Sequence, residues 1–121
     1  MLKVLPLGQV TNAGGYASHT EGYGTTSSIS ANWSHAEGRF SVTNAFYSHA
    51  EGRETLANAI YSHAEGSGSR TNGEASHAEG AATFTSGDES HAEGSGSRAT
   101  GNYSHAEGSG SISQGIGSHA E

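Results

Sequence analysis

The chain has 121 residues, a formal net charge of −7, no cysteine, one proline and 19 glycines. The lack of cysteine excludes a disulfide framework and a thiolate metal site, and the acidic balance excludes a basic footprint for nucleic acid. Leu, Ile, Val and Phe are too scarce for an ordinary globular core of this length, so an ordered structure requires a narrow interior built by repetition.

A Ser-His-x-Glu tetrad recurs eight times and divides the chain into units. The copies begin at Ser18, Ser34, Ser48, Ser62, Ser76, Ser90, Ser104 and Ser118. The first interval is 16 residues and the other six are 14 residues, and only the first copy has Thr20 in place of alanine. Every histidine lies in a copy, and the motif glutamates supply the whole net negative charge. Such periodicity indicates a stack of equivalent units.

In chain order, the sequence predicts one repeat domain over residues 1–121. We expect an N-terminal capping coil at 4–17, a coil with a two-residue insertion at 18–33, six regular coils at 34–117 and a truncated coil at 118–121. Because the last unit stops at its fourth residue, we expect the chain to be part of a longer protein. No apolar stripe with a 3.6-residue period supports a helix.

Each 14-residue unit predicts two strands of about four residues, joined by a corner at the glycine in position five and an Asn/Gly corner near position twelve. The motif serine and alanine point to one side of their strand, as do the small residues at positions eight and ten, so these four side chains fill a thin interior. The motif His and Glu then project outward, in two columns with a rise of about 4.8 Å per coil.

A lone column of carboxylates repels itself, and a thin interior buries little apolar area. We therefore expect the His/Glu face to be an interface, where imidazolium of one chain meets carboxylate of another. Such pairing predicts a raised pKa for His and a lowered pKa for Glu. In the same frame, Leu5 and Leu7 occupy the His and Glu positions. The predicted interface residues are Leu5, Leu7, His19, Glu21, His35, Glu37, His49, Glu51, His63, Glu65, His77, Glu79, His91, Glu93, His105, Glu107, His119 and Glu121.

The unit resembles the head repeats of YadA-type trimeric autotransporter adhesins, which carry motifs of the form Ser-Val-Ala-Ile-Gly at a similar spacing. Residues 4–8 (Val-Leu-Pro-Leu-Gly) approach that form, and residues 34–38 (Ser-His-Ala-Glu-Gly) are its polar variant. Similar repeats occur in tail fibres of bacteriophages. The resemblance implies an all-β, left-handed parallel β-roll assembled as a parallel homotrimer, with His and Glu on the strand that faces the axis.

The same resemblance implies a non-enzymatic fibre or head segment at a cell surface or on a virion. Its partners would be its own copies in the homotrimer and a host-cell receptor or glycan. The first ten residues lack the basic start and long apolar run of a signal peptide, and no apolar run reaches membrane-spanning length. We therefore expect no membrane insertion by this segment and no nucleic-acid partner. Phe46, Tyr47, Ile60 and Tyr61 make the early coils more apolar than the later ones, which suits a lateral interface or a binding surface.

Other functions of the motif remain as alternatives. Ser, His and Glu are hydrolase residue types, but adjacent Ser and His point to opposite faces of a strand, so we expect no enzyme and no cofactor. A three-fold axis would form rings of three His, a known Zn²⁺ ligand set, yet neighbouring Glu would satisfy them, so we expect no metal. A passive spacer remains open, and ice binding is disfavoured because Ser/Thr face inward. The candidate metal or anion rings are His35, His49, His63, His77, His91 and His105.

Overall fold

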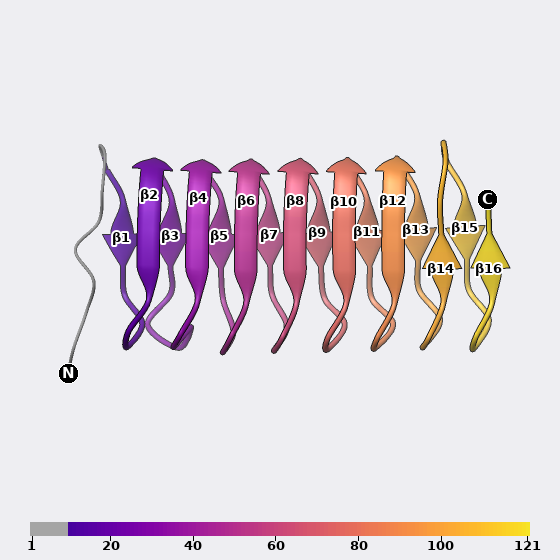
Figure 1. Ribbon diagram of the computed structural model, residues 1–121, viewed down its shortest axis with the longest axis horizontal. Coiled ribbons are helices and arrows are strands. Elements are labelled where there is room, and N and C mark those ends of the chain that lie inside the picture. The colour runs from indigo at the N-terminus through magenta and orange to yellow at the C-terminus, as the bar shows by residue number, and fades with distance from the viewer. Residues whose placement is uncertain (1–9) are drawn as a thin grey trace.

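The computed structural model describes residues 10–121 and shows a parallel β-solenoid (Figure 1). Two eight-stranded sheets run along its length, and each coil contributes one strand to each sheet. The prediction of an all-β parallel solenoid with two strands per coil is confirmed. Within the described residues, no helix has the length and apolarity needed to cross a membrane. Leu5 and Leu7, which were assigned to the interface, lie outside the described residues.

The motif sheet is the sheet whose strands carry the Ser-His-x-Glu copies. It consists of β2 (His19–Tyr23), β4 (His35–Arg39), β6 (His49–Arg53), β8 (His63–Ser67), β10 (His77–Ala81), β12 (His91–Ser95), β14 (His105–Ala106) and β16 (His119–Ala120). The opposite sheet consists of β1 (Asn12–Ala13), β3 (Thr26–Ser27), β5 (Val42–Thr43), β7 (Leu56–Ala57), β9 (Arg70–Thr71), β11 (Phe84–Thr85), β13 (Arg98–Ala99) and β15 (Ile112–Ser113).

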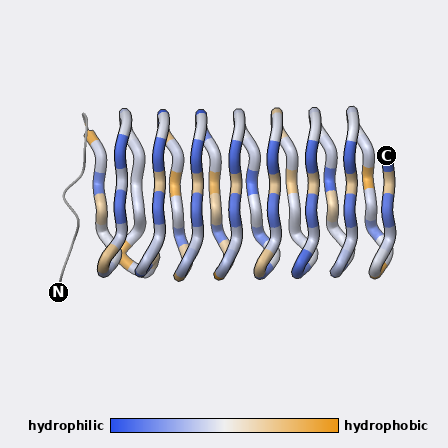
Figure 2. The backbone as a smooth tube through the Cα atoms, in the orientation of Figure 1, coloured by the Kyte–Doolittle hydropathy of each residue, from blue (hydrophilic) through white to orange (hydrophobic). Residues whose placement is uncertain are grey.

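Neighbouring strands pair in register, so that identical positions of successive units stack on one another. In the β8–β10 pair, His63 lies opposite His77 and Glu65 lies opposite Glu79. Along each strand of the motif sheet, polar and apolar residues alternate in a banded pattern that repeats from coil to coil (Figure 2). The register therefore converts a sequence repeat into columns of identical side chains.

The interior of the solenoid contains only small side chains. The buried apolar side chains of residues 10–121 are all alanines, and the largest fully buried side chains are threonines. The motif serine lies inside this core, where Ser62 Oγ donates to the carbonyl of Ala59 at 2.7 Å and accepts from Thr71 Oγ1 at 2.9 Å. The predicted inward side chains are thus confirmed, and the serine satisfies a corner carbonyl.

The prediction of two equal strands and a glycine corner is wrong. In six coils the motif strand is five residues long, and the opposite strand has two residues. The glycine in position five, such as Gly66, continues the motif strand with φ = 102°. A Cβ at Gly66 would lie 2.1 Å from the carbonyl oxygen of Gly80 in the next coil. Glycine is therefore required there by both conformation and close stacking.

The first corner lies instead at position seven, while the second spans positions twelve to fourteen, close to the predicted Asn/Gly corner, and at each corner the backbone enters the left-handed region. Position seven has φ = 73° at Gly68 but also φ = 58° at Glu54 and at Ala82. Position fourteen has the same conformation, with φ = 57° at Tyr47 and 60° at Tyr61. Each coil is thus bent at two points, and several non-glycine residues carry the strain of that conformation.

The first motif coil contains the two-residue insertion, which the structure places after β3. Ile29 and Ser30 bulge outward, and Ile29 is 78% exposed. Register is restored by Ala31, which is fully buried, and the amide of Trp33 then bonds to the carbonyl of Tyr16 at 2.9 Å. The insertion therefore changes one corner and leaves the strand pairing of both sheets intact.

Left-handed strain at position seven generates a prediction about stability. We expect Ala82→Gly to raise the free energy of unfolding by about 0.5–1 kcal/mol, because glycine removes a left-handed penalty that exceeds its own entropic cost. The matched control is Ala78→Gly, the same chemical change at a buried strand position. It should lower stability through lost packing. Thermal and urea unfolding of both variants measure this, and equal destabilisation by the two would refute it.

Candidate functional site

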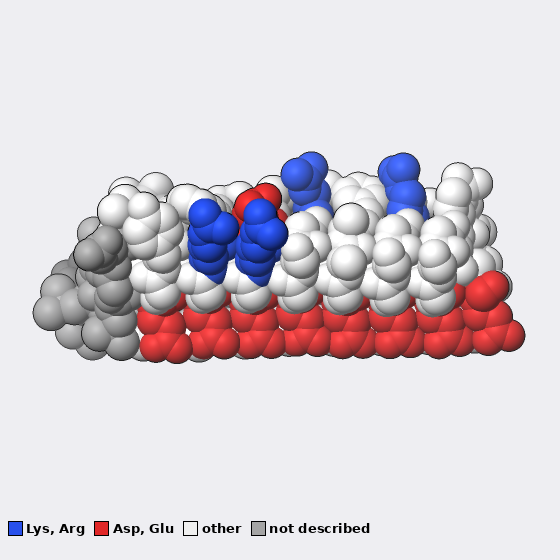
Figure 3. All heavy atoms as spheres, turned by 90° about the horizontal axis from the view of Figure 1, so that it is seen from above, with Lys and Arg blue, Asp and Glu red and all other residues white. Residues whose placement is uncertain are grey.

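The outward face of the motif sheet carries one imidazole and one carboxylate per coil, and we call this face the His–Glu ladder. Its members are His19, Glu21, His35, Glu37, His49, Glu51, His63, Glu65, His77, Glu79, His91, Glu93, His105, Glu107, His119 and Glu121. The glutamates form an unbroken acidic band along one edge, while the arginines in the same view lie away from that band (Figure 3). The predicted columns are therefore present within a single chain.

The imidazole rings form a face-to-face stack. From His35 to His119, successive ring centroids lie 4.5 to 4.9 Å apart, and their planes are parallel within 5°. The first pair differs, because the rings of His19 and His35 meet edge-on at 88°. The stacking leaves the side chains from His35 to His105 about one third exposed, with 33% for His63 and 39% for His35.

The carboxylates span neighbouring rungs of the ladder. Glu65 Oε2 lies 3.5 Å from Nε2 of His63 in its own coil, and Glu65 Oε1 lies 3.8 Å from Nε2 of His77 in the next coil. Glu51 repeats this arrangement at 3.6 and 3.7 Å towards His49 and His63. Histidine therefore has ion-pair partners in its own chain, a possibility that the sequence prediction of pairing between chains omitted.

The Nε2 atoms are nonetheless unsatisfied. Six of them are buried at the level of the atom and have no hydrogen-bond partner in the described structure, namely those of His35, His49, His63, His77, His91 and His105. The contacts to carboxylate oxygens are too long or too poorly aligned for hydrogen bonds. Among the described histidines, only His119 forms a hydrogen bond with a glutamate, with Nε2 at 3.3 Å from Glu107 Oε1. A buried polar atom without a partner is costly, so the ladder has unused binding capacity.

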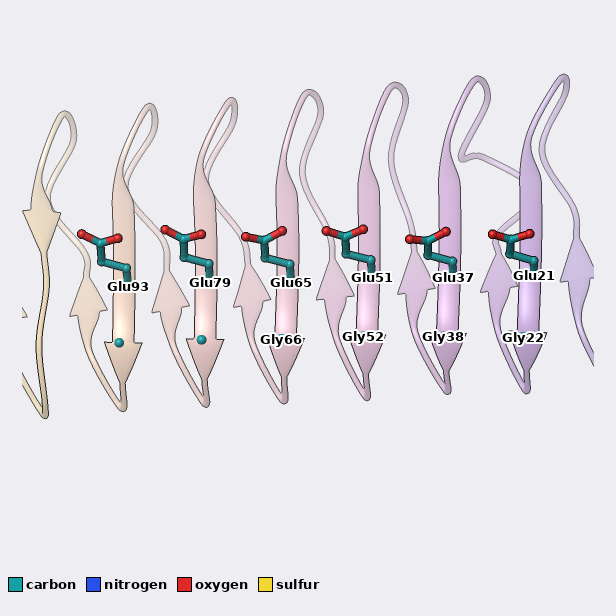
Figure 4. Close-up of a pocket in the computed structure, with 12 residues that line it drawn as sticks. Glu21, Gly22, Glu37, Gly38, Glu51, Gly52, Glu65, Gly66, Glu79 and Glu93 are labelled. Atoms are coloured by element: carbon teal, nitrogen blue, oxygen red, sulfur yellow. The ribbon is translucent and has the colours of Figure 1, made fainter.

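A shallow groove of about 900 Å³ runs beside the carboxylates. Its walls are glutamates that project side by side in the same orientation from successive strands (Figure 4). Its floor is exposed backbone, because the glycine that follows each glutamate has no side chain. The lining residues are Glu21, Gly22, Glu37, Gly38, Glu51, Gly52, Glu65, Gly66, Glu79, Gly80, Glu93 and Gly94. The groove therefore presents an acidic edge of uniform repeat to a ligand or a partner chain.

Contact between adjacent carboxyl groups makes their acidity alternate along the column. A side-chain hydrogen bond with Glu51, together with desolvation, raises the pKa of Glu37 to about 7. Hydrogen bonds with Glu51 and Glu79 raise the pKa of Glu65 to about 8, while the bond with Glu65 lowers the pKa of Glu79 to about 2. From Glu21 to Glu107, raised and lowered carboxyl pKa values thus alternate from coil to coil.

The pKa values of three histidines are lowered, whereas the sequence analysis predicts raised values. Desolvation, followed by the charge of the neighbouring histidines, lowers the pKa of His35 and of His63. Desolvation also lowers the pKa of His77, with His91 as the next cause. The predicted rise is therefore wrong for these three residues, because in-register stacking places each imidazole beside two others. The predicted lowering of the glutamate pKa is wrong at Glu37 and Glu65, where the pKa is raised.

An exposed aromatic corner is a second feature, and its stacking was not predicted. Trp33, Tyr47 and Tyr61 are the last residues of successive coils, and their rings stack at 5.2 and 5.3 Å. They are 48%, 47% and 59% exposed, and Phe46 and Ile60 flank them. The spacing of 14 residues between the three rings was a signal in the sequence from which this column could have been predicted.

Comparison with known proteins does not assign the chain to a family. No protein-family model matches the sequence, and no curated protein matches it either. The structure itself thus establishes a β-solenoid repeat protein with a stacked His–Glu ladder.

The alternation of acidity predicts a pH dependence of stability. Glu37 and Glu65 contribute stability that is full below their unfolded pKa near 4.5 and is lost as pH rises through about 7 and 8. Glu79 contributes stability that is present above 4.5 and is lost as pH falls through about 2. The histidines with lowered pKa contribute above 6.5 and lose this as pH falls. In chelator, we expect the melting temperature to be highest at about pH 4.5–6.5 and to fall through pH 8.

Two substitutions on adjacent rungs make this prediction specific. Glu65→Gln replaces the carboxyl of raised pKa with a neutral amide, so the melting temperature of this variant should fall less than that of the native chain between pH 6.5 and 8.5. Glu79→Gln, an identical change one coil away, should keep the alkaline loss. Melting curves across this range measure both, and indistinguishable alkaline slopes for the two variants would contradict an alternating column.

Proposed function

We propose that this chain is a non-enzymatic structural segment of a trimeric fibre or adhesin head, in which three left-handed β-rolls associate in parallel around the His–Glu ladders. The observation that carries the proposal is the combination of an interior made only of Ala, Ser and Thr with a straight, half-exposed ladder along the whole solenoid. Such a chain buries no large apolar side chain among residues 10–121, so association supplies burial that its own core lacks.

The geometry of the ladder supports a shared axis. One flat sheet face presents identical groups at every coil, which suits contacts that repeat at each level of a symmetric assembly. The unsatisfied Nε2 atoms would find donors or acceptors in the other chains, and carboxylates that repel along one chain would be neutralised. The resemblance of the motif to adhesin and tail-fibre repeats supports left-handed rolls and a location outside the cell or on a virion.

Two further features support a structural role. The motif serine is buried and bonded within the corner, away from the histidine ring on the other face of the strand. The aromatic corner at Trp33, Tyr47 and Tyr61 would either pack between subunits or contact a host receptor or glycan. The next two coils replace these rings with Ala75 and Glu89, and Tyr103 returns at the same position in the coil after them. The stretch without rings between Tyr61 and Tyr103 favours a passive spacer as the second candidate function.

The assembly prediction is a stable parallel trimer at micromolar concentration, measured by light scattering and native mass spectrometry. Because the chain has no cysteine, single cysteines report proximity. Glu65→Cys on the ladder should cross-link between chains on oxidation, since the three copies meet at the axis. Arg70→Cys on the exposed opposite sheet should stay uncross-linked. A folded monomer, or equal cross-linking at both positions, would rule out the proposed assembly.

The interface also predicts a difference between single and double substitutions. His63→Val with Glu65→Ile should preserve the trimer and keep or raise its melting temperature, because apolar side chains of similar shape replace a polar rung. Glu65→Ala alone should lower the free energy of unfolding by about 1–3 kcal/mol, because it leaves His63 facing an empty position. Thermal unfolding of the trimer compares the two. A single change as mild as the double would indicate a solvated face.

A further inference from the structure

We propose that the His–Glu ladder binds a row of divalent transition-metal ions such as Zn²⁺, with each ion held by one imidazole and by carboxylates of its own and the preceding coil. All of these ligands come from one chain. The proposal therefore differs from the rings of three histidines considered for the trimer axis, and it does not depend on the proposed function.

The spacing of the ligand atoms is the first argument. His63 Nε2 lies 3.7 Å from Glu51 Oε1 and 3.5 Å from Glu65 Oε2. In a tetrahedral site with bonds of about 2.1 Å, any two ligand atoms are about 3.4 Å apart. The observed separations are too long for hydrogen bonds and close to this edge length. An ion between the three atoms would satisfy all of them with small movements.

Groups of three imidazole and carboxylate ligands recur along the ladder. Groups of three side chains have ligating atoms within 4.8 Å of one another at Glu79, His91 and Glu93, and again at Glu93, His105 and Glu107. Groups of two histidines around one glutamate occur in the earlier coils, for example His49, Glu51 and His63. The recurrence follows from the in-register stacking of identical coils, so a site formed once is formed repeatedly.

The two oxygens of one carboxylate face two different histidines. Glu65 directs Oε2 towards His63 and Oε1 towards His77, and Glu79 directs Oε2 towards His77 and Oε1 towards His91 at 3.9 and 3.4 Å. This is the arrangement of a bridging carboxylate, which joins successive ions into a chain. The distance between ions would then equal the ring spacing of 4.5 to 4.9 Å.

The unsatisfied nitrogens and the charge of the column favour a cation. Each of the six Nε2 atoms without a hydrogen-bond partner offers a lone pair in its neutral form. Among the described residues, the only Arg ion pair joins Arg53 to Glu54, which lies off the ladder, so the ladder carboxylates have no permanent cationic partner. Mixed imidazole and carboxylate ligands select Zn²⁺, Cu²⁺ or Co²⁺ over Mg²⁺ and Ca²⁺, which prefer all-oxygen sites.

The first experiment measures stoichiometry. Untagged full-length chain is stripped with chelator and dialysed against Zn²⁺ at pH 7.5, and bound zinc is counted by elemental analysis. We expect more than two ions per chain. Glu65→Gln with Glu79→Gln should bind at least two fewer, because both carboxylates bridge neighbouring sites. The matched control, Glu74→Gln with Glu89→Gln, changes the same charge on the same two coils off the ladder and should bind as the native chain does.

A second measurement tests the spacing without any substitution. Since every histidine in the chain belongs to the ladder, nitrogen hyperfine splitting in the electron paramagnetic resonance spectrum of bound Cu²⁺ reports ladder imidazoles. Full loading should broaden the spectrum and give a half-field signal, because the copper ions would be about 5 Å apart, one coil rise. Equal zinc binding by the two double variants, or isolated copper spectra at full loading, would overturn the proposal. Light scattering in chelator reports the trimer separately.

Discussion

In-register stacking of identical residues at strand spacing is the constraint on which the whole molecule depends. Because each coil lies directly on the next, His63 contacts His77 and Glu65 contacts Glu79. Favourable contacts such as ring stacking are repeated at every level, and so are unfavourable ones such as carboxylate repulsion. A position in the unit therefore has to suit its own copies above and below, which restricts the side chains that it accepts.

The interior follows from the same constraint. A coil of 14 residues encloses little space, so the core accepts only Ala, Ser and Thr, and the hydroxyls bond to corner carbonyls or to one another. Such a core contributes less apolar burial than one of Leu and Phe. Backbone hydrogen bonds between coils are continuous instead, as in the bond from His63 N to Ser76 O at 3.0 Å. The stability of the fold thus depends more on the backbone hydrogen bonds between coils than on the apolar core.

Periodicity was sufficient to predict the class of fold, the inward residues and the outward columns, because alternation along a strand and the 14-residue repeat leave few arrangements. The first corner of the unit was misplaced, since glycine usually marks a turn, whereas Gly66 lies in a strand and allows the close approach of Gly80. The direction of the histidine pKa shift was wrong because one Glu partner was considered for each His. The stacking of His63 between two other rings, which a single unit cannot reveal, reverses it.

The bulge at Ile29 and Ser30 shows how such a protein can accept extra residues without losing the pairing of its strands. Extra residues at this corner leave the sheet, and Ala31 re-enters the core at the position it would have held without them. Every coil has an equivalent corner, so loops of different length could be grafted at regular intervals along the solenoid. A lineage could diversify its outer surface by such insertions while the stacked coils remain constant, and a laboratory could display peptides at a spacing set by the number of intervening coils.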